Sequence, residues 1–200
     1  MSQRWRAALS AAVMLAATGI AMPAASAAHR ARTLVVTVDP WSKTGKLKPG
    51  ERVAGTIRGS CWTTSIAVAS SNAYRCMNLH SDIYDPCFSP PRGRTSRLAC
   101  MVVPWGKVTW LVMKTQIPRS LRHPSHTPQV WGEELSNGVR CVNAEGAVGK
   151  IDGASLFYYC KPGKGWAGAP SRHPEPWATL FAPSSTAKRL HVEKVHIAWF

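Results

Sequence analysis

Short runs of apolar and β-branched residues, separated by turn-forming residues, recur along the chain from residue 33 onward. In several runs polar and apolar side chains alternate, which is the period of a strand with one buried face. Outside residues 1–28, no apolar pattern of helical period extends beyond two turns. We therefore predict strands at residues 33–39, 52–57, 61–68, 98–103, 108–114, 129–135, 139–142, 154–160, 177–182 and 190–199, with at most a short helical turn within residues 70–77.

Turn signals between these runs favour antiparallel pairing. Asn137-Gly138 lies between two strand-like runs and is a strong hairpin signal. In the last run the apolar alternation changes phase at Glu193-Lys194, which is typical of a β-bulge. No internal repeat or domain linker stands out. We predict a mainly β fold, a single disulfide-stapled antiparallel domain over residues 29–200 that is sandwich-like or barrel-like.

Residues 1–28 have the composition of an export signal peptide. Arg4 and Arg6 form a short basic start, residues 7–21 are apolar, and Ala25-Ser26-Ala27 gives a small-residue cleavage pattern. The alternative is a retained membrane anchor, but the apolar run is interrupted by Thr18 and Gly19. We expect a secreted or extracytoplasmic protein whose mature chain is a monomer without a transmembrane span.

The six cysteines all follow this leader. An even number in an exported chain favours three disulfides, and six cysteines allow about 15 connectivities. No Cys-x2-Cys or His-x3-His spacing occurs, so we predict no metal site and no cofactor. The pairing that we favour is Cys76–Cys87, Cys141–Cys160 and Cys61–Cys100.

The chain carries a formal charge of +15. Without Arg4 and Arg6 it still has 23 basic and 10 acidic residues. Such a charge attracts anionic partners, and the alternative is a basic surface that serves only solubility. The partners that we expect are an anionic polymer, a glycan or an extracellular protein.

Several cysteine-containing segments stand in a fixed order: GSCWTTSIA at residues 59–67, AYRCM at 73–77, IYDPCF at 83–88 and ELSNGVRC at 134–141. A later YYC precedes a glycine-rich loop and PEPW, and the last strand carries Ala198-Trp199. In these features the chain resembles a group of uncharacterised exported proteins from high-GC Gram-positive bacteria. The resemblance covers roughly residues 50–200. It implies export and a shared fold, and it carries over no catalytic residue.

Two patterns suggest catalysis. Gly59-Ser60-Cys61-Trp62 resembles the nucleophile segment of papain-like cysteine proteases, but Arg58 stands where that family has a cysteine. In the second pattern, His80 with Asp82 or Asp85 could form the acid–base pair of a secreted hydrolase. The simpler interpretation is that Asp85 belongs to an Asp-Pro turn and that Asp82 is solvated.

Eight tryptophans follow the leader. Trp110, Trp131, Trp177 and Trp199 lie in predicted strands, and we expect them in the core. Three others lie in predicted loops, where they either stack on a ligand or fold back over the core. The binding residues that we predict combine these loop tryptophans with nearby charges: Trp41, Trp105, Trp166, Lys107, Lys164, Arg92, Arg94, Arg97, His80 and Asp85.

The hypothesis that follows is a basic extracytoplasmic binding module for an anionic or glycan-containing partner. Its loops at residues 43–58, 92–97 and 119–126 would attract the partner, and the loop tryptophans would stack on it. The alternatives are the secreted hydrolase and a secreted inhibitor or protein-partner module. The sequence alone does not decide whether the protein is an enzyme, although it favours binding.

Overall fold

The structure is a computed structural model that describes residues 32–91, 96–117, 121, 129–144, 149–161 and 165–200. The described residues form strands and loops, with no helix among them, so the mainly β class is confirmed. The strands are β1 (Leu34–Val36), β2 (Val53–Thr64), β3 (Ala73–Asn78), β4 (Ile83–Phe88), β5 (Arg97–Cys100), β6 (Val108–Met113), β7 (Gly132–Leu135), β8 (Arg140–Asn143), β9 (Gly149–Ile151), β10 (Ala154–Leu156), β11 (Tyr158–Lys161), β12 (Trp166–Ala167), β13 (Ala178–Ala182) and β14 (His191–Trp199).

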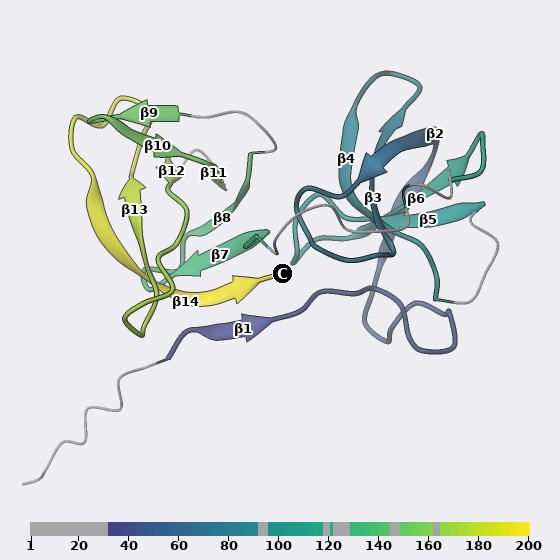
Figure 1. Ribbon diagram of the computed structural model, residues 1–200, viewed down its shortest axis with the longest axis horizontal. Helices are drawn as coiled ribbons and strands as arrows, with labels where there is room; N and C mark the ends of the chain where they lie inside the picture. Colours follow the sequence, from purple (N-terminus) through teal and green to yellow (C-terminus); the bar gives the residue numbers. More distant parts are fainter. Residues whose placement is uncertain (1–31, 92–95, 118–120, 122–128, 145–148, 162–164) are drawn as a thin grey trace, which may run out of the picture.

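Apart from β9 and β10, which form a separate two-stranded hairpin, the strands are arranged in two closed sheets rather than the one sandwich or barrel that the sequence suggests (Figure 1). Strands β2 to β6 close into what we call the N-terminal barrel. The C-terminal sheet has the order β1-β14-β13-β12-β11-β8-β7, and a pairing between β14 and β7 closes its last six strands into a ring. Most pairs are antiparallel, as predicted, but β1 is parallel to β14 and β2 is parallel to β6.

One error in the predicted strands is at Gly59. The sequence suggests a break there, whereas β2 runs through it without interruption. A Cβ atom at residue 59 would lie 2.0 Å from the carbonyl oxygen of Met77, so the glycine allows β3 to cross closely. The apolar run at Ile66 to Val68, predicted as strand, is instead a loop, because Ser65 Oγ accepts hydrogen bonds from the N–H groups of Ala67 and Val68.

Strands β3 and β4 replace the predicted helical turn and the Asp-Pro turn. In β4 the four consecutive residues from Asp85 to Phe88 are buried, so the alternation of a strand with one buried face is absent. Elsewhere the agreement is better. The Asn137-Gly138 hairpin joins β7 and β8 as predicted, with Gly138 at a φ of 79°. The bulge in β14 occurs between Val195 and Ile197, two residues after the predicted position.

All six cysteines form disulfides, as predicted, but only one of the three favoured pairs is right. The bonds are Cys61–Cys76, Cys87–Cys100 and Cys141–Cys160. Each joins directly opposed residues of two antiparallel neighbours, β2 with β3, β4 with β5, and β8 with β11. The predicted Cys76–Cys87 bond does not form because Cys76 stands opposite Tyr84 and Cys87 stands opposite Tyr74.

One apolar cluster joins the two closed sheets. Trp131 and Val142 of the C-terminal sheet pack with residues of the N-terminal barrel and its leading loop, among them Trp41 and Phe88. Nearby, the rings of Trp105 and Trp199 lie 4.9 Å apart, one from each half of the molecule. The barrel interior contains two of the disulfides and Leu98 and Leu111, and a separate cluster fills the C-terminal sheet.

We predict that non-reducing peptide mapping will link Cys61 with Cys76 and Cys87 with Cys100. Replacing both cysteines of the Cys141–Cys160 bond, which closes a separation of 19 residues, should lower the free energy of unfolding by about 3 kcal/mol. Urea titration of the full chain measures this loss. A Cys76–Cys87 peptide, or a double variant as stable as the parent, would contradict the register described above.

Candidate functional site

The structure separates the residues of the predicted acid–base pair. His80 is exposed in the turn between β3 and β4, where its backbone N–H donates to Asn78 Oδ1 over 2.9 Å. Asp82 is bonded to the same asparagine, whose Nδ2 donates to Asp82 Oδ2 over 2.8 Å. These contacts close the turn. They leave the hydrolase hypothesis without a carboxylate in hydrogen-bond contact with His80 among the described residues.

Asp85 is fully buried and organises the loop above β4. Its Oδ1 accepts from Ser65 Oγ, and its Oδ2 accepts from the backbone N–H of Ile66 over 3.0 Å. Arg75 Nε lies 4.0 Å from the same Oδ2. Burial raises the pKa of the Asp85 carboxyl above its usual value, and the hydrogen bonds from Ser65 and Ile66 oppose part of that shift. Asp85 therefore holds the loop in place and does not face a partner.

The three loop tryptophans are buried or half-buried. Trp41 is 7% exposed, and its Nε1–H donates to the carbonyl oxygen of Phe88 over 3.0 Å. Trp105 is half-buried against Trp199, and Trp166 is half-buried with its ring edge-on to Tyr159 at 5.6 Å. Trp41 and Trp105 thus follow the alternative in which loop tryptophans fold back over the core.

Among the predicted basic residues, Lys107 and Arg97 are exposed. Arg92, Arg94 and Lys164 lie outside the described residues, as does most of the basic loop at 119–126. The predicted strand tryptophans Trp131, Trp177 and Trp199 are buried, whereas Trp110 is only half-buried.

Arg97 is part of an arrangement that the sequence did not reveal. Its guanidinium lies 4.0 Å from the centre of the Trp110 ring, and that ring is 5.5 Å from Trp41. Val112 stands opposite Arg97 on β5 and opposite Arg58 on β2, so both arginines are on one face of the sheet. We call Arg58, Arg97, Trp110 and Val112 the basic face. No described carboxylate lies within ion-pair distance of either arginine.

Trp62 is the exposed aromatic residue that sequence reasoning passed over. Its side chain is 45% exposed, and the Arg75 guanidinium lies 5.8 Å from its ring centre. The register shift between Cys61 and Thr63 places Trp62 as the extra residue of a bulge. The neighbouring papain-like motif carries no thiol chemistry here, because Cys61 is bonded to Cys76.

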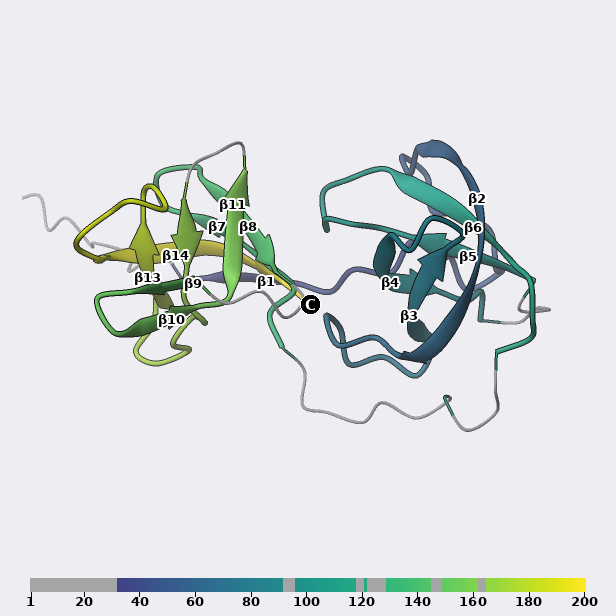
Figure 2. The ribbon, with the colours of Figure 1, turned by 90° about the horizontal axis from the view of Figure 1, so that it is seen from above.

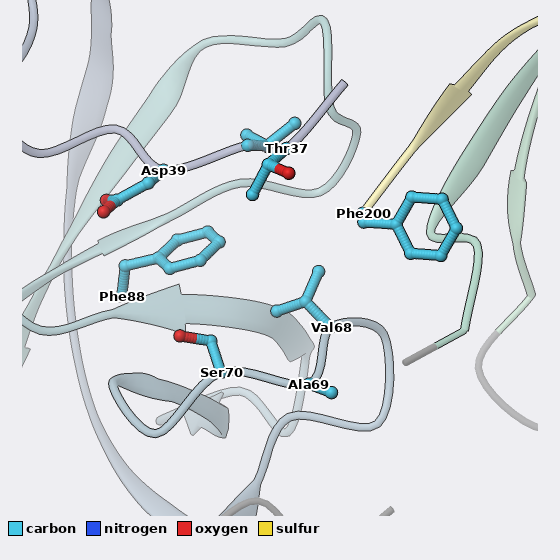
Figure 3. A pocket seen from close by; sticks show the side chains of 8 residues that line it. Thr37, Asp39, Val68, Ala69, Ser70, Phe88 and Phe200 are labelled. Atoms are coloured by element: carbon cyan, nitrogen blue, oxygen red, sulfur yellow. The ribbon is translucent and has the colours of Figure 1, made fainter. Parts of the chain in front are cut away.

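A crevice of about 380 Å³ lies where the two halves of the molecule meet (Figure 3). Thr37 and Asp39 line one side of it and Val68 to Ser70 the other, while the ring of Phe200 turns away. Two of its lining side chains expose almost no surface, since Phe88 is 1% exposed and Val68 is 4% exposed. Asp39 Oδ1 accepts a hydrogen bond from the backbone N–H of Trp41 over 2.9 Å. The crevice therefore offers little surface to a ligand.

Glu133 is an acidic residue inside the C-terminal sheet. It is fully buried, and neither carboxyl oxygen has a hydrogen-bond partner among the described residues. It stands opposite Cys141 and Ala198, both fully buried, which places it on the inner face of the ring. Burial raises the pKa of the Glu133 carboxyl well above its usual range. Burial and the nearby Glu133 carboxyl together raise the pKa of Tyr158.

Other types of site are not assembled in the described part of the chain. No three His, Cys, Asp or Glu side chains gather there into a metal-binding group. The same residues include no helix of the length and apolarity needed to cross a membrane. Comparison with protein-family models, curated proteins and solved structures finds no match to this chain.

We predict that Glu133→Leu stabilises the protein, and that the gain increases with pH. Because the pKa of Glu133 is raised on folding, its neutral form is tolerated at low pH, and stability is lost as the pH rises above the usual glutamate value of 4.5. At pH 7 the gain should be about 1–3 kcal/mol, the cost of a buried polar group without a hydrogen bond.

Thermal and urea unfolding of the full chain between pH 4 and pH 9 test this prediction. Glu51→Gln, at a half-buried residue before β2, is the control for removing one carboxyl group from the chain. A Glu133→Leu variant that is less stable than the parent at every pH would show that the carboxyl has a stabilising partner.

Proposed function

We propose that the protein is exported and acts outside the cytoplasm as a binding module for an anionic or glycan-containing partner. The observation that carries this proposal is the basic face, where Arg58 and Arg97 share one side of the sheet without a described acidic partner. An anion held there would meet two guanidinium groups, which bind carboxylates and phosphates through paired hydrogen bonds.

The disulfides support the proposed location outside the cytoplasm. Three cross-strand bonds with no free cysteine are typical of proteins in an oxidising compartment. The leader-like composition of residues 1–28 and the resemblance to exported proteins point the same way, and they stay predictions.

The aromatic part of the proposal shifts from the loop tryptophans to Trp110 and Trp62. Trp110 supports the Arg97 guanidinium from below, which fixes the direction of the charge. Trp62 is exposed enough for one ring face to stack on a sugar, with the charged Arg75 beside it. Trp41 and Trp105 take no part, because their rings are packed within the protein.

Retention of the full chain on immobilised inorganic polyphosphate tests the electrostatic part of the proposal. We expect binding at low salt that weakens steeply as salt is added, because screening reduces the attraction between exposed charges. The double variant Arg58→Ala with Arg97→Ala should bind about 10-fold more weakly, since two charges are lost from one face.

The matched control is Lys188→Ala with Arg189→Ala, which removes the same charge from exposed positions between β13 and β14. This control should lose less than 2-fold, by the same argument from distance and screening. An equal loss in both double variants would mean that net charge alone drives retention. Retention that is independent of salt, or absent at low salt, would refute the electrostatic mechanism.

A further inference from the structure

Strand β2 has two edges, and one of them is paired with a neighbouring strand over only part of its length. On one side it pairs with β6 from Val53 to Gly59. On its other side, pairing with β3 begins only at Gly59, because β3 ends at Asn78, whose N–H turns to the carbonyl oxygen of Asp82. No described strand lies beside Gly55 to Arg58 on that side. We call these four residues the free edge of β2.

Two residues of the free edge direct their backbone groups outward. The carbonyl oxygen of Gly59 accepts from the N–H of Lys114, so Gly59 faces β6. Because successive residues of a strand alternate in direction, Ile57 also faces β6, while Thr56 and Arg58 face away from it. Their N–H and C=O groups thus point to solvent among the described residues. Val53 to Thr56 and Arg58 are all exposed.

In natural proteins, prolines, charges, bulges or a covering loop prevent such an unpaired edge from pairing with another chain. Here the register shifts between Val53 and Gly55, which limits the free edge at its start. No proline occurs within β2. Positive charge is the feature that remains to prevent pairing. Arg52, three residues before the free edge, and Arg58, at its end, are both exposed, and Arg97 is on the same face as Arg58. Figure 2 shows β2 on the side of the barrel away from the C-terminal sheet.

We propose that the free edge of β2 binds an extended acidic peptide segment by adding it as a strand to the N-terminal barrel. Backbone hydrogen bonds to Thr56 and Arg58 would hold the segment, and its carboxylates would meet Arg52, Arg58 and Arg97. This inference rests on the proposed function and names the class of partner for the basic face.

Charge complementarity selects this occupant. A second copy of the chain that paired through the same edge would bring Arg52 and Arg58 against arginines of the other copy, and like charges opposed across a strand pair are unfavourable. An acidic strand has the opposite charge at those positions. A polyanion without a peptide backbone would satisfy the arginines but would leave the groups of Thr56 and Arg58 unpaired.

The test compares two probes on the full chain: the fluorescently labelled peptide EDTVTVED and inorganic polyphosphate. Thr56→Pro removes an outward N–H without removing a hydrogen bond to β6, so the barrel should still fold. We expect it to weaken peptide binding at least 10-fold and polyphosphate binding less than 2-fold. Thr56→Val, which retains the N–H, should bind both probes like the parent.

Two measurements do not depend on the proline variant. An N-methylated form of the peptide, which keeps its charge and loses its backbone donors, should bind at least 10-fold more weakly to the parent protein. In the NMR spectrum of the parent, the amide signals of Thr56 and Arg58 should shift on adding the peptide and gain protection from hydrogen exchange, whereas Ile57 should change less.

Equal binding of the N-methylated peptide, or unchanged amides at Thr56 and Arg58, would overturn strand addition. If the parent binds polyphosphate but not the peptide, this inference fails while the proposed function stands. If it binds neither probe at low salt, both fail.

Discussion

The close approach of Gly132 to the loop that carries Pro104 and Trp105 determines how the two halves of the fold meet. A Cβ atom at residue 132 would lie 2.8 Å from Pro104 Cγ and 3.0 Å from Trp105 Cζ3, closer than a packed side chain allows. With glycine there, Trp105 reaches Trp199. The Arg140 guanidinium lies 5.4 Å from the Trp105 ring centre and 5.8 Å from that of Trp199, so one cation covers both rings.

This junction explains why the loop tryptophans Trp41 and Trp105 are buried or half-buried. A chain divided into two small closed sheets has more surface to cover than one sandwich of the same length. Trp41 and Trp131 fill the shared cluster, and Trp105 closes its rim. Loop position therefore says little about exposure here. The local sequence around Trp41 or Trp105 contains no sign of the distant strands against which the rings pack, β4 and β6 for Trp41 and β14 for Trp105.

Sequence reasoning identified strands that are rich in apolar and β-branched residues, such as β6 and β14. It failed where a tertiary contact sets the pattern. Gly59 reads as a strand break, but its role is visible only once β3 crosses it. Asp85 has the sequence pattern of a turn residue. The residues next to it in the sequence do not indicate that Ser65 and Ile66 will donate hydrogen bonds to its carboxylate. The cysteine pairing followed from strand register, which depends on β3 and β4 being recognised as strands.

One signal for β3 was present in the sequence and was missed. Residues 72–78 read NAYRCMN and residues 137–143 read NGVRCVN, with four of seven positions identical. Both segments turn at the first asparagine, then enter a strand whose cysteine is buried in a disulfide with an adjacent strand. Both arginines lie over tryptophan rings, Arg75 over Trp62 and Arg140 over Trp105 and Trp199. Comparison with the clear hairpin at Asn137-Gly138 would have indicated a strand at β3.

The arginines that pack against tryptophan rings or belong to the basic face show how one residue type serves two roles in this fold. Arg75 and Arg140 have acidic partners in Asp85 and Glu134, so their charge is compensated. Their guanidinium groups pack against tryptophan rings. Arg58 and Arg97 have no such partner among the described residues. A guanidinium that is fixed over an aromatic ring and lacks a counter-ion keeps its hydrogen-bonding capacity for another molecule. Arg97, held over Trp110 on the same face as Arg58, differs in this way from Arg75 and Arg140.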